Sequence, residues 1–204
     1  IIGIGAQKCA TSWVFQVLKS HPEILTASRP NPKELNFFNF EFVKGYDWYH
    51  RHFDFDGRWA MEFSVRYFTE PSVPRRLYHY HSNAKLLVCI RNPVERAYSQ
   101  HKHEFQQNRL SPTRHDFNKA LEQNPSYIDQ GKYATHLKRY LEYFSEDQIH
   151  LILYEQIQKN PERVAHDLFD FIGVNPEHDP GTLNQRENVS YRYRSHGLKT
   201  WFRN

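Results

Sequence analysis

A lysine and two hydroxyl side chains separate an apolar run at the start of the sequence from a helical pattern. The apolar run covers residues 1–4, and Lys8, Thr11 and Ser12 precede or begin the helical pattern that ends at Ser20. A strand that turns into a helix through small residues directs backbone N–H groups and the helix N-terminus at one point. The lysine adds a point charge and the hydroxyls add donors. The spacing predicts a site for a phosphate-bearing ligand, although an ordinary turn with an exposed lysine fits it too.

A second candidate anion contact follows the clearest apolar strand pattern, residues 85–90. Arg91 comes directly after that pattern, and Ser99 lies about two helical turns further on. An arginine at a strand end can donate two hydrogen bonds to one phosphate, and a returning loop would bring the serine to the same group. The alternative is a solvated arginine and a surface serine, which is common for exposed side chains.

Length and charge limit the classes of function. With 204 residues the chain is long enough for one domain, and we expect residues 1–204 to form it. A formal net charge of +4 suits small anionic ligands better than nucleic acid, which usually needs a denser basic face. The two cysteines, Cys9 and Cys89, make no disulfide framework. No apolar run is long enough to span a membrane.

Strand and helix patterns alternate along the chain, which predicts an α/β fold with a central, mostly parallel sheet and helices on both faces. Ligands of such sheets bind at the carboxyl ends of the strands, where both candidate anion loops fall. The expected strands are residues 1–5, 24–27, 58–63, 85–90 and 150–154. The expected helices are residues 12–19, 45–49, 71–80, 93–106, 132–144 and 161–172.

Two phosphate-binding motifs on one α/β sheet resemble those of the sulfotransferases that use 3′-phosphoadenosine 5′-phosphosulfate (PAPS). Residues 8–13 are similar to the 5′-phosphosulfate loop of that family, and residues 91–99 to its 3′-phosphate motif. Residues 34–38, 45–49 and 133–137 are similar, in order, to the heparan sulfate sulfotransferases, especially the N-sulfotransferase domain, and to bacterial relatives. This resemblance weakens after about residue 174 and implies a P-loop-like three-layer sandwich.

The resemblance also implies a role for each matching residue. Lys8 would contact the 5′-phosphosulfate and stabilise charge on the bridging oxygen. Trp13 matches a tryptophan that stacks on adenine in the cytosolic branch, and Tyr133 would lie near the nucleotide. The 3′-phosphate would be held by Arg91 and Ser99. The full set of expected nucleotide contacts is Lys8, Cys9, Ala10, Thr11, Ser12, Trp13, Arg91, Ser99, Tyr133 and Arg194.

Glu34 matches the glutamate proposed as general base in the heparan sulfate branch, so the resemblance implies that Glu34 and Lys8 are catalytic. A base beside the acceptor can remove its proton as the sulfuryl group moves in line. Without the resemblance, an exposed loop carboxylate is the favoured interpretation of Glu34, because unpaired glutamates are usually exposed. Glu62 is a secondary candidate acid or base, with a strand-end carboxylate paired to an arginine as the alternative.

Two positions depart from the pattern of the family. Ala10 replaces the common glycine, and we expect it to restrict the backbone there to ordinary φ values. Phe63 stands where the family usually has a lysine that is thought to assist catalysis. Lys8 is then expected to be the only close cation on the transferring group, unless Arg66 or His101 substitutes.

The basic tail, residues 188–199, is expected either to close over the 3′-phosphate through Arg194 and its neighbours or to be solvated. No metal is expected. Four histidines, His79, His81, His101 and His103, lie at spacings of two, whereas helical metal pairs favour i, i+4.

The resulting prediction is an enzyme that transfers a sulfuryl group from PAPS to a hydroxyl or amine of a carbohydrate or small metabolite, by in-line displacement. One alternative is a P-loop nucleotide phosphotransferase, although Gln7 replaces the glycine that should precede its lysine. The other alternative is a binding module without catalytic activity, which is consistent with Phe63 in place of the usual lysine. No nucleic-acid partner is expected. A cytoplasmic location is preferred for a bacterial relative and the Golgi lumen for an animal one. Oligomeric state stays undetermined.

Overall fold

A five-stranded, fully parallel sheet forms the centre of the molecule, in the order β2-β3-β1-β4-β5. The computed structural model describes residues 1–28, 33–181 and 183. The strands are β1 (Ile2–Gly5), β2 (Ile24–Thr26), β3 (Trp59–Phe63), β4 (Leu86–Ile90) and β5 (Ile149–Leu153). Each begins and ends within one residue of its expected bounds, and the predicted α/β architecture is confirmed.

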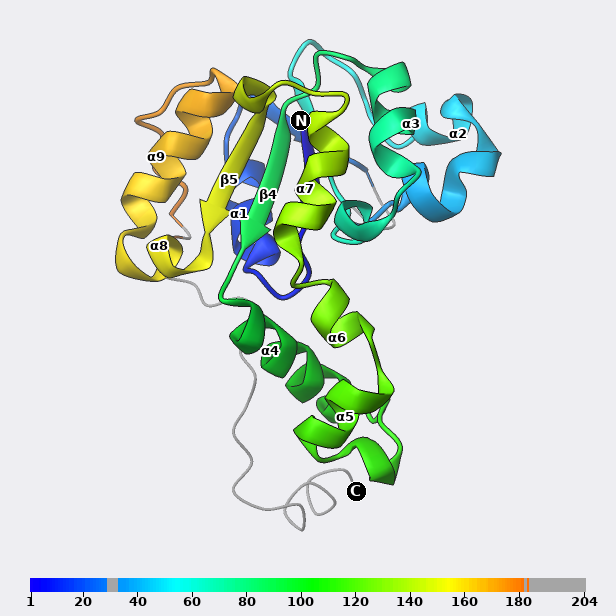
Figure 1. Ribbon diagram of the computed structural model, residues 1–204. Coiled ribbons are helices and arrows are strands. Elements are labelled where there is room, and N and C mark those ends of the chain that lie inside the picture. Colours follow the sequence, from blue (N-terminus) through cyan, green and yellow to red (C-terminus); the bar gives the residue numbers. More distant parts are fainter. Residues whose placement is uncertain (29–32, 182, 184–204) are drawn as a thin grey trace, which may run out of the picture.

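Helices surround this sheet, with α1 and α7 on opposite faces (Figure 1). The long helices are α1 (Thr11–Lys19), α3 (Val73–Tyr80), α4 (Pro93–Gln106), α7 (Tyr133–Leu141) and α9 (Pro161–Ile172), and the short ones are α2 (Tyr46–His50), α5 (Phe117–Gln123), α6 (Ser126–Asp129) and α8 (Tyr154–Lys159). Single turns include η1 (Phe37–Glu41) and η3 (Tyr67–Thr69). Helix α9 packs against α1, and α7 packs against η3.

Local sequence explains where the main helices begin and end. Asn92 caps α4 and Asn160 caps α9, in each case by accepting a backbone N–H of the first turn, and a proline follows each cap. Gly173 ends α9 in the left-handed region, with φ 84°. These signals agree with the expected bounds of both helices.

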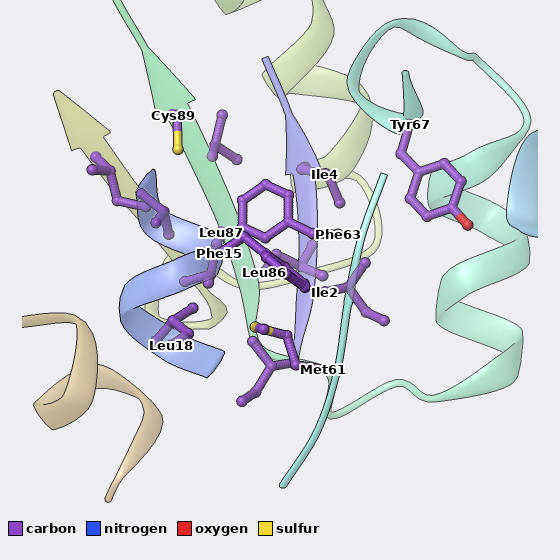
Figure 2. Packing of buried hydrophobic residues seen from close by; sticks show 14 of the residues in the cluster. Ile2, Ile4, Phe15, Leu18, Met61, Phe63, Tyr67, Leu86, Leu87 and Cys89 are labelled. Carbon is purple, nitrogen blue, oxygen red and sulfur yellow. The ribbon is translucent and has the colours of Figure 1, made fainter. Parts of the chain in front are cut away.

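The core lies between the sheet and its helices, and β4 is buried along nearly its whole length. Figure 2 shows Phe63 inside this cluster of apolar side chains. Gly3 pairs with Phe63 across the sheet, and a Cβ at Gly3 would lie only 2.2 Å from the Phe63 ring. The absence of a side chain at Gly3 therefore makes room for the bulky ring.

Helices α4, α5 and α6, which we call the arm, extend beyond the end of β4 (Figure 1). Its apolar cluster is small, with Ala97, Ala120 and Tyr127 buried. The fully buried Arg96 adds polar contacts, since it donates to the backbone oxygen of Tyr127 at 2.5 Å and to Gln100 Oε1 at 2.9 Å. Polar contacts thus hold much of the arm together.

Candidate active site

The loop between β1 and α1 has the backbone shape of an anion site. Lys8 has φ 68° and Ala10 has φ 64°, so both residues occupy the left-handed region. The expectation that Ala10 would keep an ordinary φ was wrong. A non-glycine residue can enter this region at a cost of about 1–2 kcal/mol, and here the turn from strand to helix imposes it. The sequence alone reveals only that Ala10 has a small side chain, which does not crowd the loop.

The N-terminus of α1 receives no hydrogen bond from the side chain of its cap residue, Ala10. This differs from α4 and α9, whose asparagine caps accept first-turn N–H groups. The first backbone N–H groups of α1 therefore have no side-chain acceptor at the cap. Next to a loop in which Lys8 and Ala10 are left-handed, this favours an anion as their acceptor. Thr11 is buried at the same point and Ser12 is half-buried.

Several cations gather beside this loop. Burial lowers the pKa of Lys8, and the nearby charges of Arg91, Lys102 and Lys33 lower it further. Like charges held this close repel one another, and a bound polyanion would relieve the repulsion. The electrostatics of the loop therefore favour a ligand that carries several negative charges.

The second predicted anion loop follows β4, the strand beside β1 in the sheet. The Arg91 guanidinium donates to Glu95 Oε2 at 2.8 Å and lies over the Tyr154 ring, 4.1 Å from its centroid. Ser99 is half-buried in α4. Both predicted 3′-phosphate residues thus lie past the carboxyl end of β4, and a shared grip on one phosphate stays a prediction.

Tyr133 connects the two loops. Its hydroxyl lies 3.7 Å from Cys9 Sγ, and the backbone of Arg91 opposes the rise in the pKa of that hydroxyl that burial causes. Cys9 is fully buried, and burial raises the pKa of its thiol to about 11. The predicted contribution of Cys9 to the anion site is therefore through its backbone, while its side chain fixes the spacing of the loops.

Trp13 is buried in α1, where its indole N–H donates to the backbone oxygen of Leu183 at 3.1 Å. Stacking of this ring on adenine stays a prediction. Arg194, expected at the 3′-phosphate, lies outside the described residues.

The predicted base, Glu34, lies in a strained turn beside the end of β3. Its φ is 66°, and its backbone N–H donates to the oxygen of Phe63 at 2.9 Å. Burial raises the pKa of the Glu34 carboxyl, while Lys33, the backbone of Val65 and then Arg66 oppose this rise. A partly desolvated carboxylate with a raised pKa is suited to accept a proton near neutral pH.

Among the residues that the structure describes, Glu62 pairs with no arginine, contrary to one of the two alternatives above. Its carboxylate accepts hydrogen bonds from Tyr49 at 2.9 Å, Ser64 at 2.7 Å and Tyr67 at 2.6 Å. It is 1% exposed. The three hydroxyl donors explain how this carboxylate tolerates burial.

The same hydroxyl groups hold the segment that carries Glu34. Ser64 Oγ accepts the backbone N–H of Asn36 at 3.0 Å, and the Tyr67 hydroxyl accepts that of Phe38 at 3.1 Å. Glu62 therefore acts through its neighbours, as a positioning residue for the segment that begins at Glu34.

Sequence reasoning missed Lys33. Its ammonium lies 3.4 Å from Thr11 Oγ1 and 3.2 Å from Ser12 Oγ, so Lys8 is not the only cation at the loop. Of the suggested substitutes, His101 contacts the backbone of His115 in the arm, away from the loop, whereas Arg66 lies over the Phe40 ring and close enough to Glu34 to lower its pKa. The position of Lys33 directly before the candidate base was the available signal.

A polar cleft of about 610 Å³ opens next to the loop, where Gln7 forms part of its wall. Arg66, Arg109 and Arg114 line it, together with the ring of Phe40, which is 57% exposed. The neighbouring Phe37 and Phe38 are in the core, so most of the aromatic segment is structural. Another cavity, of about 470 Å³, lies at the amino ends of β3 and β4, away from both loops.

Within the described ranges, no group of three or more His, Cys, Asp or Glu side chains is arranged to hold a metal ion. In the same residues, no helix combines the length and apolar character needed to cross a membrane.

A family model described as the sulfotransferase domain matches residues 1–195. The chain belongs to the sulfotransferase domain family. This match confirms the resemblance noted from the motifs and extends past residue 174, where the resemblance weakens.

Two curated relatives of this sulfotransferase domain act on heparan sulfate, by their names. Human bifunctional heparan sulfate N-deacetylase/N-sulfotransferase 2 is 30% identical over 192 residues, covering 85% of this chain and 22% of that protein. Mouse heparan sulfate glucosamine 3-O-sulfotransferase 5 is 31% identical over 162 residues, covering 73% of this chain and 46% of that protein. The chain therefore spans less than half the length of either relative.

Solved structures include similar sulfotransferases. One from Alicyclobacillus acidocaldarius is 30% identical, with a TM-score of 0.78 over 92% of this chain and 86% of that one. A mouse sulfotransferase solved in complex with PAP shares the fold, with a TM-score of 0.59 and 19% identity over 90% of this chain and 60% of that one.

Proposed function

We propose that this sulfotransferase domain, residues 1–204, transfers a sulfuryl group from PAPS to a hydroxyl or amine. The observation that carries the proposal is that Glu34 lies next to the loop between β1 and α1, which we call the phosphate loop. Lys33 spans the two, since its ammonium lies 3.7 Å from Glu34 Oε1 and within 3.4 Å of the hydroxyls of Thr11 and Ser12. A base next to an anion loop is the arrangement that direct transfer between a nucleotide and an acceptor needs.

The nucleotide would lie across the carboxyl ends of β1 and β4. Lys8 and the start of α1 would hold the 5′-phosphosulfate, and Arg91 with Ser99 would hold the 3′-phosphate. A structural neighbour was solved in complex with PAP, the product of such a transfer, which supports a nucleotide of this class as the ligand. When PAPS is bound, it supplies the sulfuryl group, while this chain supplies cations, N–H donors and a proton acceptor.

In the proposed step, the acceptor oxygen or nitrogen attacks sulfur and forms a new bond to it. The bond from sulfur to the 5′-phosphate oxygen breaks, and its electron pair stays on that oxygen. Glu34 takes the proton of the acceptor, and Lys8 stabilises the charge on the departing phosphate.

We assign the acceptor to the polar cleft beside Gln7. Its three arginines and the exposed ring of Phe40 suit a polar ligand with a flat, partly apolar face, such as a carbohydrate. The names of the heparan sulfate relatives support a carbohydrate acceptor, and a small metabolite is the second class to test.

The decisive experiment is an acceptor screen with PAPS, read by the mass of the sulfated product. Glu34→Gln should lower the rate of transfer about 100- to 10,000-fold, the range of a general base, and should leave PAP binding nearly unchanged. For the wild type, kcat/KM should fall as pH drops through a pKa above the usual value for glutamate, because the base must be ionised. Unchanged activity of Glu34→Gln would refute the assignment of the base.

The inactive-module alternative predicts PAP binding without transfer to any acceptor in the screen. The phosphotransferase alternative predicts transfer from ATP with Mg²⁺.

A further inference from the structure

Lys33 occupies a position between the phosphate loop and the candidate base. Its ammonium contacts Thr11 Oγ1 and Ser12 Oγ on one side, and Glu34 Oε1 at 3.7 Å on the other. Only 18% of its side chain is exposed. A solvated surface lysine would not hold its charge among three polar groups from two separate segments, because ordering a long side chain costs entropy.

The aromatic residue at the end of β3 explains why the ammonium lies there. Phe63 is fully buried over Gly3, and its ring carries no charge to the loop. The Lys33 ammonium lies 5.6 Å from the centroid of that ring. An ammonium within about 6 Å of a ring is attracted by the ring quadrupole, so Phe63 helps to place the lysine.

We propose that Lys33 is a catalytic residue that places a second cation, beside Lys8, on the transferring sulfuryl group. The proposal rests on the proposed function above. The Phe63 position provides no cation in this chain, and Lys33 brings one over the same residue from the neighbouring loop.

The electron balance of the reaction defines what this cation does. As the acceptor bonds to sulfur, the electron pair of the breaking S–O bond moves to the 5′-phosphate oxygen, and the acceptor proton moves to Glu34. Negative charge therefore grows on the group that Thr11 and Ser12 hold. An ammonium in hydrogen-bond range of both hydroxyls stabilises that charge in the transition state more than in the ground state.

Lys33→Met tests the proposal, because methionine keeps much of the side-chain length and removes the charge. We expect kcat at saturating PAPS to fall about 100- to 1,000-fold, as for loss of one preorganised donor. The Kd for PAP, measured by calorimetry, should rise less than about tenfold, and Lys33→Arg should retain much more activity than Lys33→Met.

Lys44 offers a matched control. Its ammonium also pairs with a carboxylate, Glu41 at 2.6 Å, and also lies over an aromatic ring, Trp48 at 4.5 Å. Lys44→Met removes the same charge and the same two kinds of contact away from the phosphate loop. Its kcat should stay within about twofold of wild type.

A rescue variant tests the relation to Phe63. Adding Phe63→Lys to Lys33→Met should raise kcat at least tenfold above the single variant, provided that circular dichroism shows a folded protein. The missing side chain of Gly3 leaves room for the lysine stem. If the double variant does not fold, the comparison of Lys33→Met with Lys33→Arg decides.

The proposal is overturned if Lys33→Met keeps kcat within threefold of wild type, or if a folded rescue variant gains nothing. The proposal would also be overturned if kcat stayed unchanged while kcat/KM and the affinity for PAP fell equally. Lys33 would then contribute only to binding of the nucleotide. Failure of the proposed function has a different signature, because the wild-type protein and Lys44→Met would then transfer nothing, and the role of Lys33 would be refuted with it.

Discussion

At the scale of single residues, the phosphate loop depends on backbone conformations that its side chains do not favour. Ala10 is held at φ 64°, and it also starts α1 without a side-chain cap. Glycine at this position would lose no energy to a Cβ clash and would be as good a cap. The loop thus keeps its shape because β1, α1 and Tyr133 constrain it, rather than through local preference.

Ala10→Gly should therefore stabilise the protein. The left-handed region costs a non-glycine residue about 1–2 kcal/mol, and the greater freedom of glycine in the unfolded chain costs about 0.5–1 kcal/mol. The free energy of unfolding, from urea titration, should rise by about 0.5–1 kcal/mol. Ala134→Gly, at an exposed position of α7, should lower it by up to about 1 kcal/mol. A loss at both positions would contradict this account of Ala10.

The residues of the site differ in how far the sequence reveals them. Lys8 and Arg91 follow strong strand patterns, so their place at the edge of the sheet could be predicted. Lys33 was not predicted, because its one sequence signal is its place directly before Glu34, while its contacts with Thr11 and Ser12 join residues more than twenty positions apart. Side-chain contacts between separate loops leave no periodic signal.

At the scale of elements, buried hydroxyl groups connect β3, η3 and η1. Tyr67 is the central member of this network, since its hydroxyl donates to Glu62 and accepts from the backbone N–H of Phe38. The network reaches the candidate base because Glu34 and Phe38 belong to the same short segment. Its integrity should therefore affect both stability and catalysis.

Tyr67→Phe should lower the free energy of unfolding by about 2–3 kcal/mol. The change removes one hydrogen bond to the buried Glu62 carboxylate and leaves the Phe38 N–H without its acceptor. The kcat for sulfuryl transfer should fall as well, because the segment that carries Glu34 loses an anchor. Tyr78→Phe, at a 40% exposed tyrosine of α3, should change stability by less than about 0.5 kcal/mol. Equal effects of the two variants would show that the network positions nothing.

The helices and strands were predictable to different degrees, depending on how clear an apolar pattern each one has in the sequence. Strands such as β4 are continuous apolar runs, which are the clearest signal in a sequence. Helices α5 and α6 were not predicted, because buried polar contacts of Arg96 replace an apolar stripe in the arm. The π-helical turn η1 was also missed, since its aromatic residues follow neither strand nor helix periodicity.

At the scale of the whole molecule, the net charge is a modest +4, but positive charge is concentrated in one region. Arg91, Lys102 and Lys33 each lower the pKa of Lys8 at the carboxyl edge of the sheet. Such a field attracts polyanions more strongly than the average surface does, and salt weakens it. The two candidate anion loops follow neighbouring strands, and Tyr133 lies between them. Under the proposed function, the ligand would be recognised by the distance between its two phosphates.

This two-point recognition predicts how ligands stabilise the protein against heat. Ligand at 100 times its Kd adds about 2.7 kcal/mol to the folded state, and each kcal/mol is worth about 2–4 °C in a chain of this size. PAP should therefore raise Tm by about 5–10 °C, whereas AMP, which lacks the 3′-phosphate, should raise it much less at the same concentration. Arg91→Ala should reduce the PAP shift toward that of AMP and leave the AMP shift nearly unchanged, because only the 3′-phosphate loses its partner. Equal shifts with PAP and AMP in the wild type would contradict a phosphate site at Arg91, and a larger shift with ATP and Mg²⁺ would favour the phosphotransferase alternative.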